Sequence, residues 1–199
     1  MPRRLPALAL FLLATLASAE ERPSRADLQK VLALYERSVV RVRGPREAGV
    51  GIIVGTEGQV LTSVRHVSLE AAQVEYDGRT LPASVVLANA YLKVAVVAAP
   101  AGDYPAVPVR VANESPIGEW LIGVVPGRGK QKMNTPASAL ARKAPAPFFD
   151  VALALTPGSP LFDTRGRLVA VCVQRRGRGC RALPMDAVKQ QLATQVARP

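Results

Sequence analysis

The sequence has little of the chemistry from which metal sites and nucleic-acid surfaces are built. It contains one histidine, His66, and two cysteines, Cys172 and Cys180, among 199 residues. Because an ordinary zinc site needs about four ligands of these types or carboxylates, the composition argues against a metal centre, and we expect no cofactor. Aromatic residues make up only 5% of the chain, and none is interleaved with its arginines. A base-stacking surface for nucleic acid is therefore not expected.

Long apolar runs are also absent, except at the start of the chain. Residues 1–4 are basic, residues 5–16 are apolar, and the small residues 17–19 precede a charged segment. This order is typical of a Sec-type secretory signal peptide, and the apolar run is shorter than most membrane-spanning helices. We therefore predict that residues 1–19 are removed on export, so that the mature protein is periplasmic or secreted. An uncleaved N-terminal anchor is the alternative.

Acidic residues are outnumbered, with 15 Asp and Glu against 26 Lys and Arg and a net charge of +11. Such a charge favours contact with anionic surfaces, including a cell envelope, but it does not by itself define a function. A solvated basic face is the simpler interpretation. The basic residues gather in three clusters: Arg37, Arg41, Arg43 and Arg46; Arg128, Lys130 and Lys132; and Arg175, Arg176, Arg178 and Arg181.

The rest of the chain alternates short β-type runs with turns. Ser24 and Asp27 form a helix-start signal, so we expect one helix within residues 20–37 and a second over 186–196. No linker or repeat divides residues 38–199, and many short strands favour a barrel or a sandwich over a βαβ fold. The predicted strands are 39–42, 50–54, 59–63, 74–76, 81–87, 94–98, 107–111, 120–125, 137–142, 151–155 and 168–174.

The two cysteines flank Arg176 symmetrically, within a segment that has β-type residues on one side and glycines at its centre. If the segment is a hairpin that turns there, Cys172 and Cys180 face one another. In an exported protein they would then form a disulfide. Two separate thiols are the alternative.

Five segments, taken in order, resemble the trypsin-like serine proteases, particularly the bacterial HtrA/Deg type. They are SVVRVRG (first strand), GVGIIVGTEGQVLTSVRHV (Gly-rich strand pair and the catalytic-histidine segment), KVAVVAAP (the strand that begins with the catalytic aspartate), IGEWLIGVVPG (opening of the second barrel) and GSPLFDTRGRLVAV (end of the nucleophile loop). The resemblance implies an all-β fold, a trypsin-like double six-stranded β-barrel with short N- and C-terminal helices. The peptidase domain would cover residues 38–199.

The catalytic triad that the resemblance implies is incomplete. Peptide hydrolysis by such a fold needs a hydroxyl nucleophile, an imidazole base and a carboxylate that holds the imidazole. His66 falls in the base segment, one residue later than usual, and we interpret it as a vestigial base. Lys93 stands where the family has the aspartate. An ammonium group cannot accept the imidazole N–H, and it opposes the imidazolium that forms during attack.

The nucleophile position allows two alignments. Matching Pro160 and Leu161 to the family's Pro-Leu puts Pro157 at the serine, which removes both the hydroxyl and a backbone N–H donor. The other alignment makes Ser159 the nucleophile but needs more gaps, so we favour the first. Leu155 then replaces the glycine two residues before the nucleophile.

The strand after the nucleophile hairpin binds substrate in this family. Here it carries Gln174 and Arg175 where an aromatic residue and a glycine are common. An arginine at this edge crowds the primary pocket, offers a charge to an acidic ligand, or is simply exposed. We therefore predict a non-catalytic exported protein that binds a peptide or protein partner. An active serine endopeptidase using His66 and Ser159 is the alternative.

Overall fold

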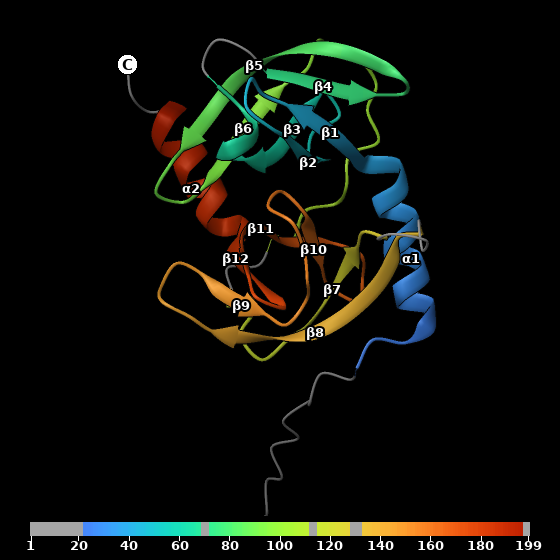
Figure 1. Ribbon diagram of the computed structural model, residues 1–199. Helices are drawn as coiled ribbons and strands as arrows, with labels where there is room; N and C mark the ends of the chain where they lie inside the picture. The colour runs from blue at the N-terminus through green and yellow to red at the C-terminus, as the bar shows by residue number, and fades with distance from the viewer. Residues whose placement is uncertain (1–21, 69–71, 112–114, 128–132, 197–199) are drawn as a thin grey trace, which may run out of the picture.

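The computed structural model describes residues 22–68, 72–111, 115–127 and 133–196, which form two β-barrels and two terminal α-helices (Figure 1). The predicted signal peptide, residues 1–19, lies outside the described residues. The elements are α1 (Arg25–Ser38), β1 (Val39–Arg43), β2 (Ala48–Ile53), β3 (Gln59–Ser63), the 3-10 helix η1 (Val64–His66), β4 (Ala72–Tyr76), β5 (Arg79–Asn89), β6 (Val94–Ala98), β7 (Trp120–Val125), β8 (Thr135–Lys143), β9 (Phe149–Val151), β10 (Pro160–Phe162), β11 (Leu168–Arg176), β12 (Gly179–Pro184) and α2 (Met185–Val196).

Each barrel is closed and contains six strands. The first has the order β1-β2-β3-β6-β5-β4, and the second has the order β10-β11-β12-β9-β8-β7. All strand pairs within them are antiparallel. Closure leaves neither barrel with a free edge along its full length. The predicted all-β double six-stranded barrel is confirmed, and the sandwich is excluded.

Strand positions were predicted well where alternation and turn residues agree. The runs at 59–63, 94–98 and 120–125 are β3, β6 and β7 with the same bounds. Asp77 and Gly78 make the tight turn between β4 and β5, and both have positive φ, 49° and 70°.

Two predicted strands were wrong. Residues 107–111 form only an isolated bridge, in which Val109 pairs with Leu168. Pro108 lacks an N–H, so this segment cannot support a regular ladder. The run 151–155 is a strand only up to Val151, after which the chain turns.

Helix α1 lies beside both barrels and packs against β2, β7 and β8 (Figure 1). Its start is a capping box, in which the Ser24 hydroxyl accepts from the Asp27 N–H and the Asp27 carboxylate accepts from the Ser24 N–H. Val31, Leu34 and Tyr35 are its buried apolar side chains. The helix therefore fixes the start of β1 relative to the second barrel.

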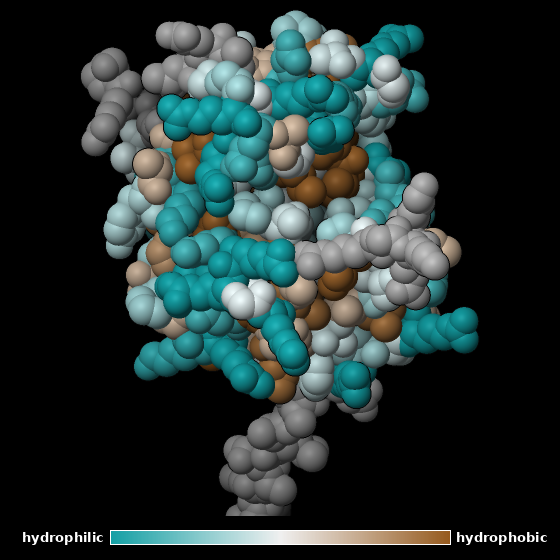
Figure 2. All heavy atoms as spheres, viewed as in Figure 1, coloured by the Kyte–Doolittle hydropathy of each residue, from teal (hydrophilic) through white to brown (hydrophobic). Residues whose placement is uncertain are grey.

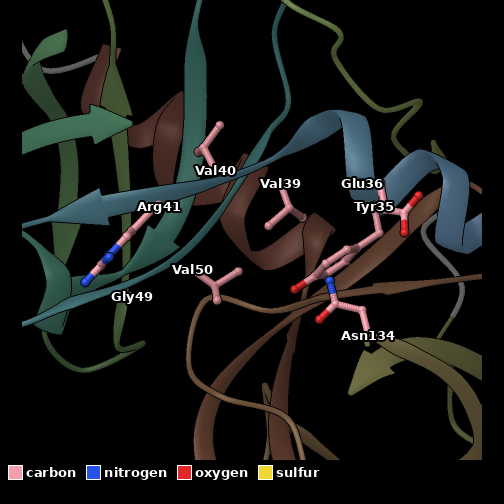
Figure 3. Close-up of a pocket in the computed structure, with 8 residues that line it drawn as sticks. All are labelled: Tyr35, Glu36, Val39, Val40, Arg41, Gly49, Val50 and Asn134. Atoms are coloured by element: carbon pink, nitrogen blue, oxygen red, sulfur yellow. The ribbon is translucent and has the colours of Figure 1, made fainter. Parts of the chain in front are cut away.

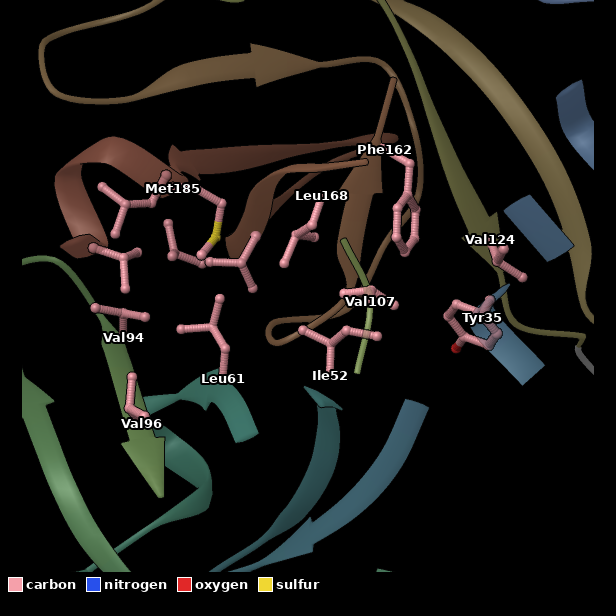
Figure 4. Packing of buried hydrophobic residues seen from close by; sticks show 14 of the residues in the cluster. Tyr35, Ile52, Leu61, Val94, Val96, Val107, Val124, Phe162, Leu168 and Met185 are labelled. Atoms are coloured by element: carbon pink, nitrogen blue, oxygen red, sulfur yellow. The ribbon is translucent and has the colours of Figure 1, made fainter. Parts of the chain in front are cut away.

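The buried side chains form one cluster inside each barrel and one that includes both. The shared cluster combines Ile52, Leu61 and Val96 of the first barrel with Phe162 and Leu168 of the second (Figure 4). Because this core belongs to both barrels, they form a single folding unit. In the described part of the chain, no helix is both long and apolar enough to cross a membrane.

Candidate active site

His66 ends η1, directly after β3, and only 5% of its surface is exposed. Its ring lies against the backbone of Gly49, where an added Cβ would sit 2.0 Å from the ring Cε1. The ring Nδ1 is 3.1 Å from the Thr62 hydroxyl oxygen. That hydroxyl donates its own hydrogen to the Val50 carbonyl at 2.7 Å, so it accepts from Nδ1–H. The proton on Nδ1 leaves Nε2 as the unprotonated nitrogen.

Burial of the imidazole lowers the pKa of His66 below its usual range. Removal from water disfavours the charged ring, and Arg65 contributes in the same direction, whereas Glu47 and the Val50 backbone oppose the shift. The ring is therefore neutral at physiological pH. A neutral imidazole can accept a proton as a base, but here the ring is neutral because it is buried.

Because His66 is the only histidine, its titration can be followed without assignment. We expect its Hε1 proton NMR signal to titrate with a midpoint below the ordinary value of about 6.5, and the urea-unfolded protein to titrate near that value. The folded ring binds its proton less tightly than the unfolded one. The contribution of the neutral His66 ring to the free energy of unfolding is therefore fully present well above pH 6.5. It declines as the pH falls below the unfolded pKa towards the lower folded pKa. Equal midpoints in the folded and unfolded proteins would contradict the buried, neutral ring.

Lys93 precedes β6, in the position that the resemblance assigns to the aspartate. It has a left-handed backbone conformation, with φ 58°, and its carbonyl accepts from the Val64 N–H of η1 at 3.3 Å. Its ammonium, however, donates to the Gln174 side-chain oxygen of the second barrel at 2.7 Å. Within the described ranges, no carboxylate forms a hydrogen bond or ion pair with the His66 ring.

Gly158, the residue after Pro157, comes close to the groups that hold His66. Gly158 has φ 89°, and a Cβ there would lie 1.9 Å from the Val50 carbonyl oxygen and 3.3 Å from the Thr62 hydroxyl. Its N–H donates to the Cys172 carbonyl at 2.7 Å. The loop therefore brings Gly158 against the groups that hold His66, and the residue before it, Pro157, has neither a hydroxyl nor an N–H.

Ser159 is turned into the protein. It is 1% exposed, and its hydroxyl is 3.1 Å from the hydroxyl of Thr156. Its N–H donates to the Thr156 carbonyl, and its carbonyl accepts from the Cys172 N–H. Among the residues that the structure describes, no hydrogen bond joins Ser159 to His66.

The backbone donors that would form an oxyanion hole are also unavailable. In this fold they are the N–H of the nucleophile and that of the residue two positions earlier. With Pro157 at the nucleophile position, these correspond to Pro157, which has no N–H, and Leu155. The Leu155 N–H donates to the Leu153 carbonyl at 2.8 Å.

The predicted disulfide between Cys172 and Cys180 is not formed in the structure and stays a prediction. Arg176 pairs with Gly179, so the hairpin turns at residues 177–178, within the glycine-containing segment. Cys180 consequently faces Arg175, while Cys172 faces Ala182 beyond a register shift. Both cysteines are buried free thiols. A hydrogen bond with Cys180 and burial together raise the pKa of the Cys172 thiol.

Gln174 and Arg175 lie on β11 beyond the part that pairs with β10. The β10 ladder ends at Val171, and Cys172 is bound by the nucleophile loop. From Val173 to Arg176, no described strand pairs with β11 on that side. Gln174 is half-buried under Lys93, and Arg175 is exposed.

A cavity of about 470 Å³ borders Gly49 and Val50 of β2. Tyr35 and Glu36 from the end of α1, residues 39–41 of β1, and Asn134 before β8 complete its lining (Figure 3). Burial raises the pKa of the Tyr35 hydroxyl. The cavity therefore lies between the end of α1 and the first two strands, and His66 is not part of its lining.

Sequence reasoning missed two partners of the histidine. Thr62 is four residues before His66, and Gly49 lies on the neighbouring strand; both are inside the quoted Gly-rich segment. The one-residue lengthening before His66 was the available signal, because it changes which side chain meets the imidazole. Nothing in the sequence indicated that the Leu155 N–H would be taken by Leu153.

These features define a trypsin-like double barrel with an altered catalytic centre. Residues 49–171 match the family model of the trypsin-like peptidase domain, and the chain belongs to this family. It is 31% identical over 146 residues to a probable periplasmic serine endoprotease DegP-like protein of Hahella chejuensis, covering 66% of this chain and 31% of that protein. A protein of the same description from Ectopseudomonas mendocina is 28% identical over 206 residues, covering 90% of this chain and 43% of its own length. The chain thus spans less than half the length of these curated relatives.

Solved structures share the fold. The serine endoprotease from Yersinia pestis superposes with a TM-score of 0.72 at 19% identity, covering 89% of this chain and 69% of that one. The Rv3671c protease from M. tuberculosis, in its active form, superposes with a TM-score of 0.67 at 21% identity, covering 87% of each chain. At these identities the likeness concerns the fold alone.

Proposed function

We propose that this protein is a catalytically silent trypsin-like domain, a pseudoprotease, that binds a peptide or protein segment in the cleft between its barrels. The observation that carries the proposal is the pairing of the two candidate catalytic side chains. His66 bonds to Thr62, and Ser159 bonds to Thr156, so neither is presented to the other. Lys93 stands where the family has the aspartate and, in the favoured alignment, Pro157 stands where it has the serine.

The expected loss of catalysis is large. Removal of the nucleophile or the base from a serine-protease triad costs about 10⁶-fold in rate. Loss of one oxyanion donor costs about 10²- to 10³-fold more. Because all of these features are altered here, hydrolysis would be close to the uncatalysed rate.

Peptide binding is supported by the backbone of β11. From Val173 to Arg176, none of the strands that the structure describes pairs with β11 on the side away from β12, next to the Lys93–Gln174 bridge. An extended peptide can add to such an edge through main-chain hydrogen bonds, without any catalytic group.

Export to the periplasm is part of the same proposal. The relatives are named as periplasmic proteins, and residues 1–19 have the pattern of a signal peptide. The proposal would place residues 20–199 in the periplasm or at the cell envelope, where the basic clusters would also meet anionic surfaces.

The catalytic part is tested with a fluorophosphonate probe on purified residues 20–199. We expect no covalent labelling under conditions that label trypsin, and no difference between the wild type and Ser159→Ala. A wild-type protein that reacts, with the reaction lost in Ser159→Ala, would establish an active serine and refute the proposal.

A further inference from the structure

The open edge of β11 is surrounded by cations. Arg175 and Arg176 end the strand, Arg178 lies in the turn that follows, and Lys93 reaches the same edge from the first barrel. We call these four residues the basic rim. Because successive residues of a strand point to opposite sides, Arg175 and Arg176 flank both faces of the edge.

The rim has no anionic partner in the part of the chain that the structure describes. Arg175, Arg176 and Arg178 are exposed and form no ion pair there, and the Lys93 ammonium is held by the neutral Gln174 amide at 2.7 Å. An ammonium has three N–H donors, so two remain for a ligand.

The Asp150 carboxylate, which lies near this edge, does not neutralise the basic rim. Asp150 of β9 is paired with Arg181 of β12, with N–O distances of 2.9 and 3.1 Å. Arg142 lies opposite Asp150 on β8 and adds a further exposed cation. Hydrophilic side chains gather over β9 and β12 in Figure 2, which has the view of Figure 1.

We infer that the partner segment is acidic: an extended stretch with adjacent Glu or Asp residues that pairs with the β11 edge and whose carboxylates meet the basic rim. The inference rests on the proposed function. A polypeptide is favoured over other polyanions because the unpaired main chain of residues 173–176 lies between the cations. On an added strand, one carboxylate would face Arg175 and its neighbour would face Arg176 or Lys93.

The test compares two labelled ten-residue peptides by fluorescence anisotropy. One has four consecutive Glu flanked by Val and Thr, and the other has Gln in place of each Glu. We expect the Glu peptide to bind more tightly than the Gln peptide, with an affinity that falls as salt is raised. The double variant Arg175→Gln/Arg176→Gln should weaken binding of the Glu peptide about tenfold.

The matched control is Arg25→Gln/Arg79→Gln, which removes two exposed arginines from α1 and β5. It has the same net charge, and we expect it to change the affinity by less than about twofold. Equal losses in the two double variants would show a general charge effect and overturn the inference. Melting temperatures of both variants verify that the fold is intact.

The remaining outcomes separate this inference from the proposed function. Equal affinity for the Glu and Gln peptides would overturn the acidic partner but leave peptide binding in place. Binding of neither peptide would overturn both the inference and peptide binding. Rim-dependent binding that is tighter to phosphatidylglycerol vesicles than to the Glu peptide would assign the rim to a lipid surface and also overturn the inference. Labelling by the fluorophosphonate probe tests the catalytic part of the proposed function, and its result does not depend on these three binding outcomes.

Discussion

Replacing Gly158 with alanine is expected to lower the free energy of unfolding by about 4 kcal/mol. Two effects add. A side chain at φ 89° is strained, and the new Cβ would lie 1.9 Å from the Val50 carbonyl oxygen of the first barrel. The contact is with backbone, so a side-chain rotation cannot relieve it. The loop would have to move away from β2, and this would break the hydrogen bond from the Gly158 N–H to the Cys172 carbonyl.

Urea unfolding of Gly158→Ala provides the measurement, and Gly78→Ala is the matched control. Gly78 also has a positive φ, 70°, but an added Cβ meets nothing within 4 Å. Its substitution should cost only the backbone strain, about 1 to 2 kcal/mol. If both variants lose the same stability, Gly158 is not held against Val50, and the geometry of the nucleophile loop is wrong.

Phe162→Ala is expected to cost about 3 to 5 kcal/mol. Phe162 is fully buried in the cluster that both barrels share (Figure 4). Removal of its ring leaves a cavity between the barrels, and the surrounding side chains can refill it only partly. Since the total stability of a domain is about 5 to 15 kcal/mol, the variant should lose a large share of its free energy of unfolding.

The shared core also predicts how this variant unfolds. Tryptophan fluorescence reports on Trp120 of the second barrel and far-UV circular dichroism reports on the whole domain, and both should show one coincident transition at a lower urea midpoint. Leu140→Ala, at a side chain that is 38% exposed on β8, should cost about 1 kcal/mol or less. Separate transitions for the two signals would mean that the barrels are independent.

The histidine site combines the fold of the trypsin-like peptidase family with a hydroxyl partner for its imidazole. Thr62 gives the Nδ1–H of His66 an acceptor, the role of a carboxylate in an active triad. A neutral hydroxyl cannot stabilise an imidazolium as a carboxylate does.

Sequence patterns predicted the barrel strands because period-two alternation and turn residues are local signals. β3, β6 and β7 were placed to the residue, and the order of five short segments predicted the two-barrel fold. The segment 107–111 failed because β-type residues surround Pro108, whose missing N–H matters only once a partner strand is required.

Side-chain partners could not be predicted in the same way. Cys172 lies opposite Ala182 and Cys180 opposite Arg175, because register depends on turn geometry and on which face is buried, and the two thiols are hydrogen-bonded but not bridged. The partners of His66 and Ser159, both threonines, are likewise set by how β2 and the nucleophile loop pack on β3.

The residue types alone determined that Lys93 cannot act as a carboxylate and that Pro157 can neither attack nor donate, because these are properties of the side chains themselves. Only the tertiary structure decided that Lys93 reaches across to Gln174, that the Ser159 hydroxyl pairs with Thr156 and that a row of cations borders the part of β11 that no described strand pairs. Each of these depends on contacts between segments far apart in the chain, which local preferences do not specify.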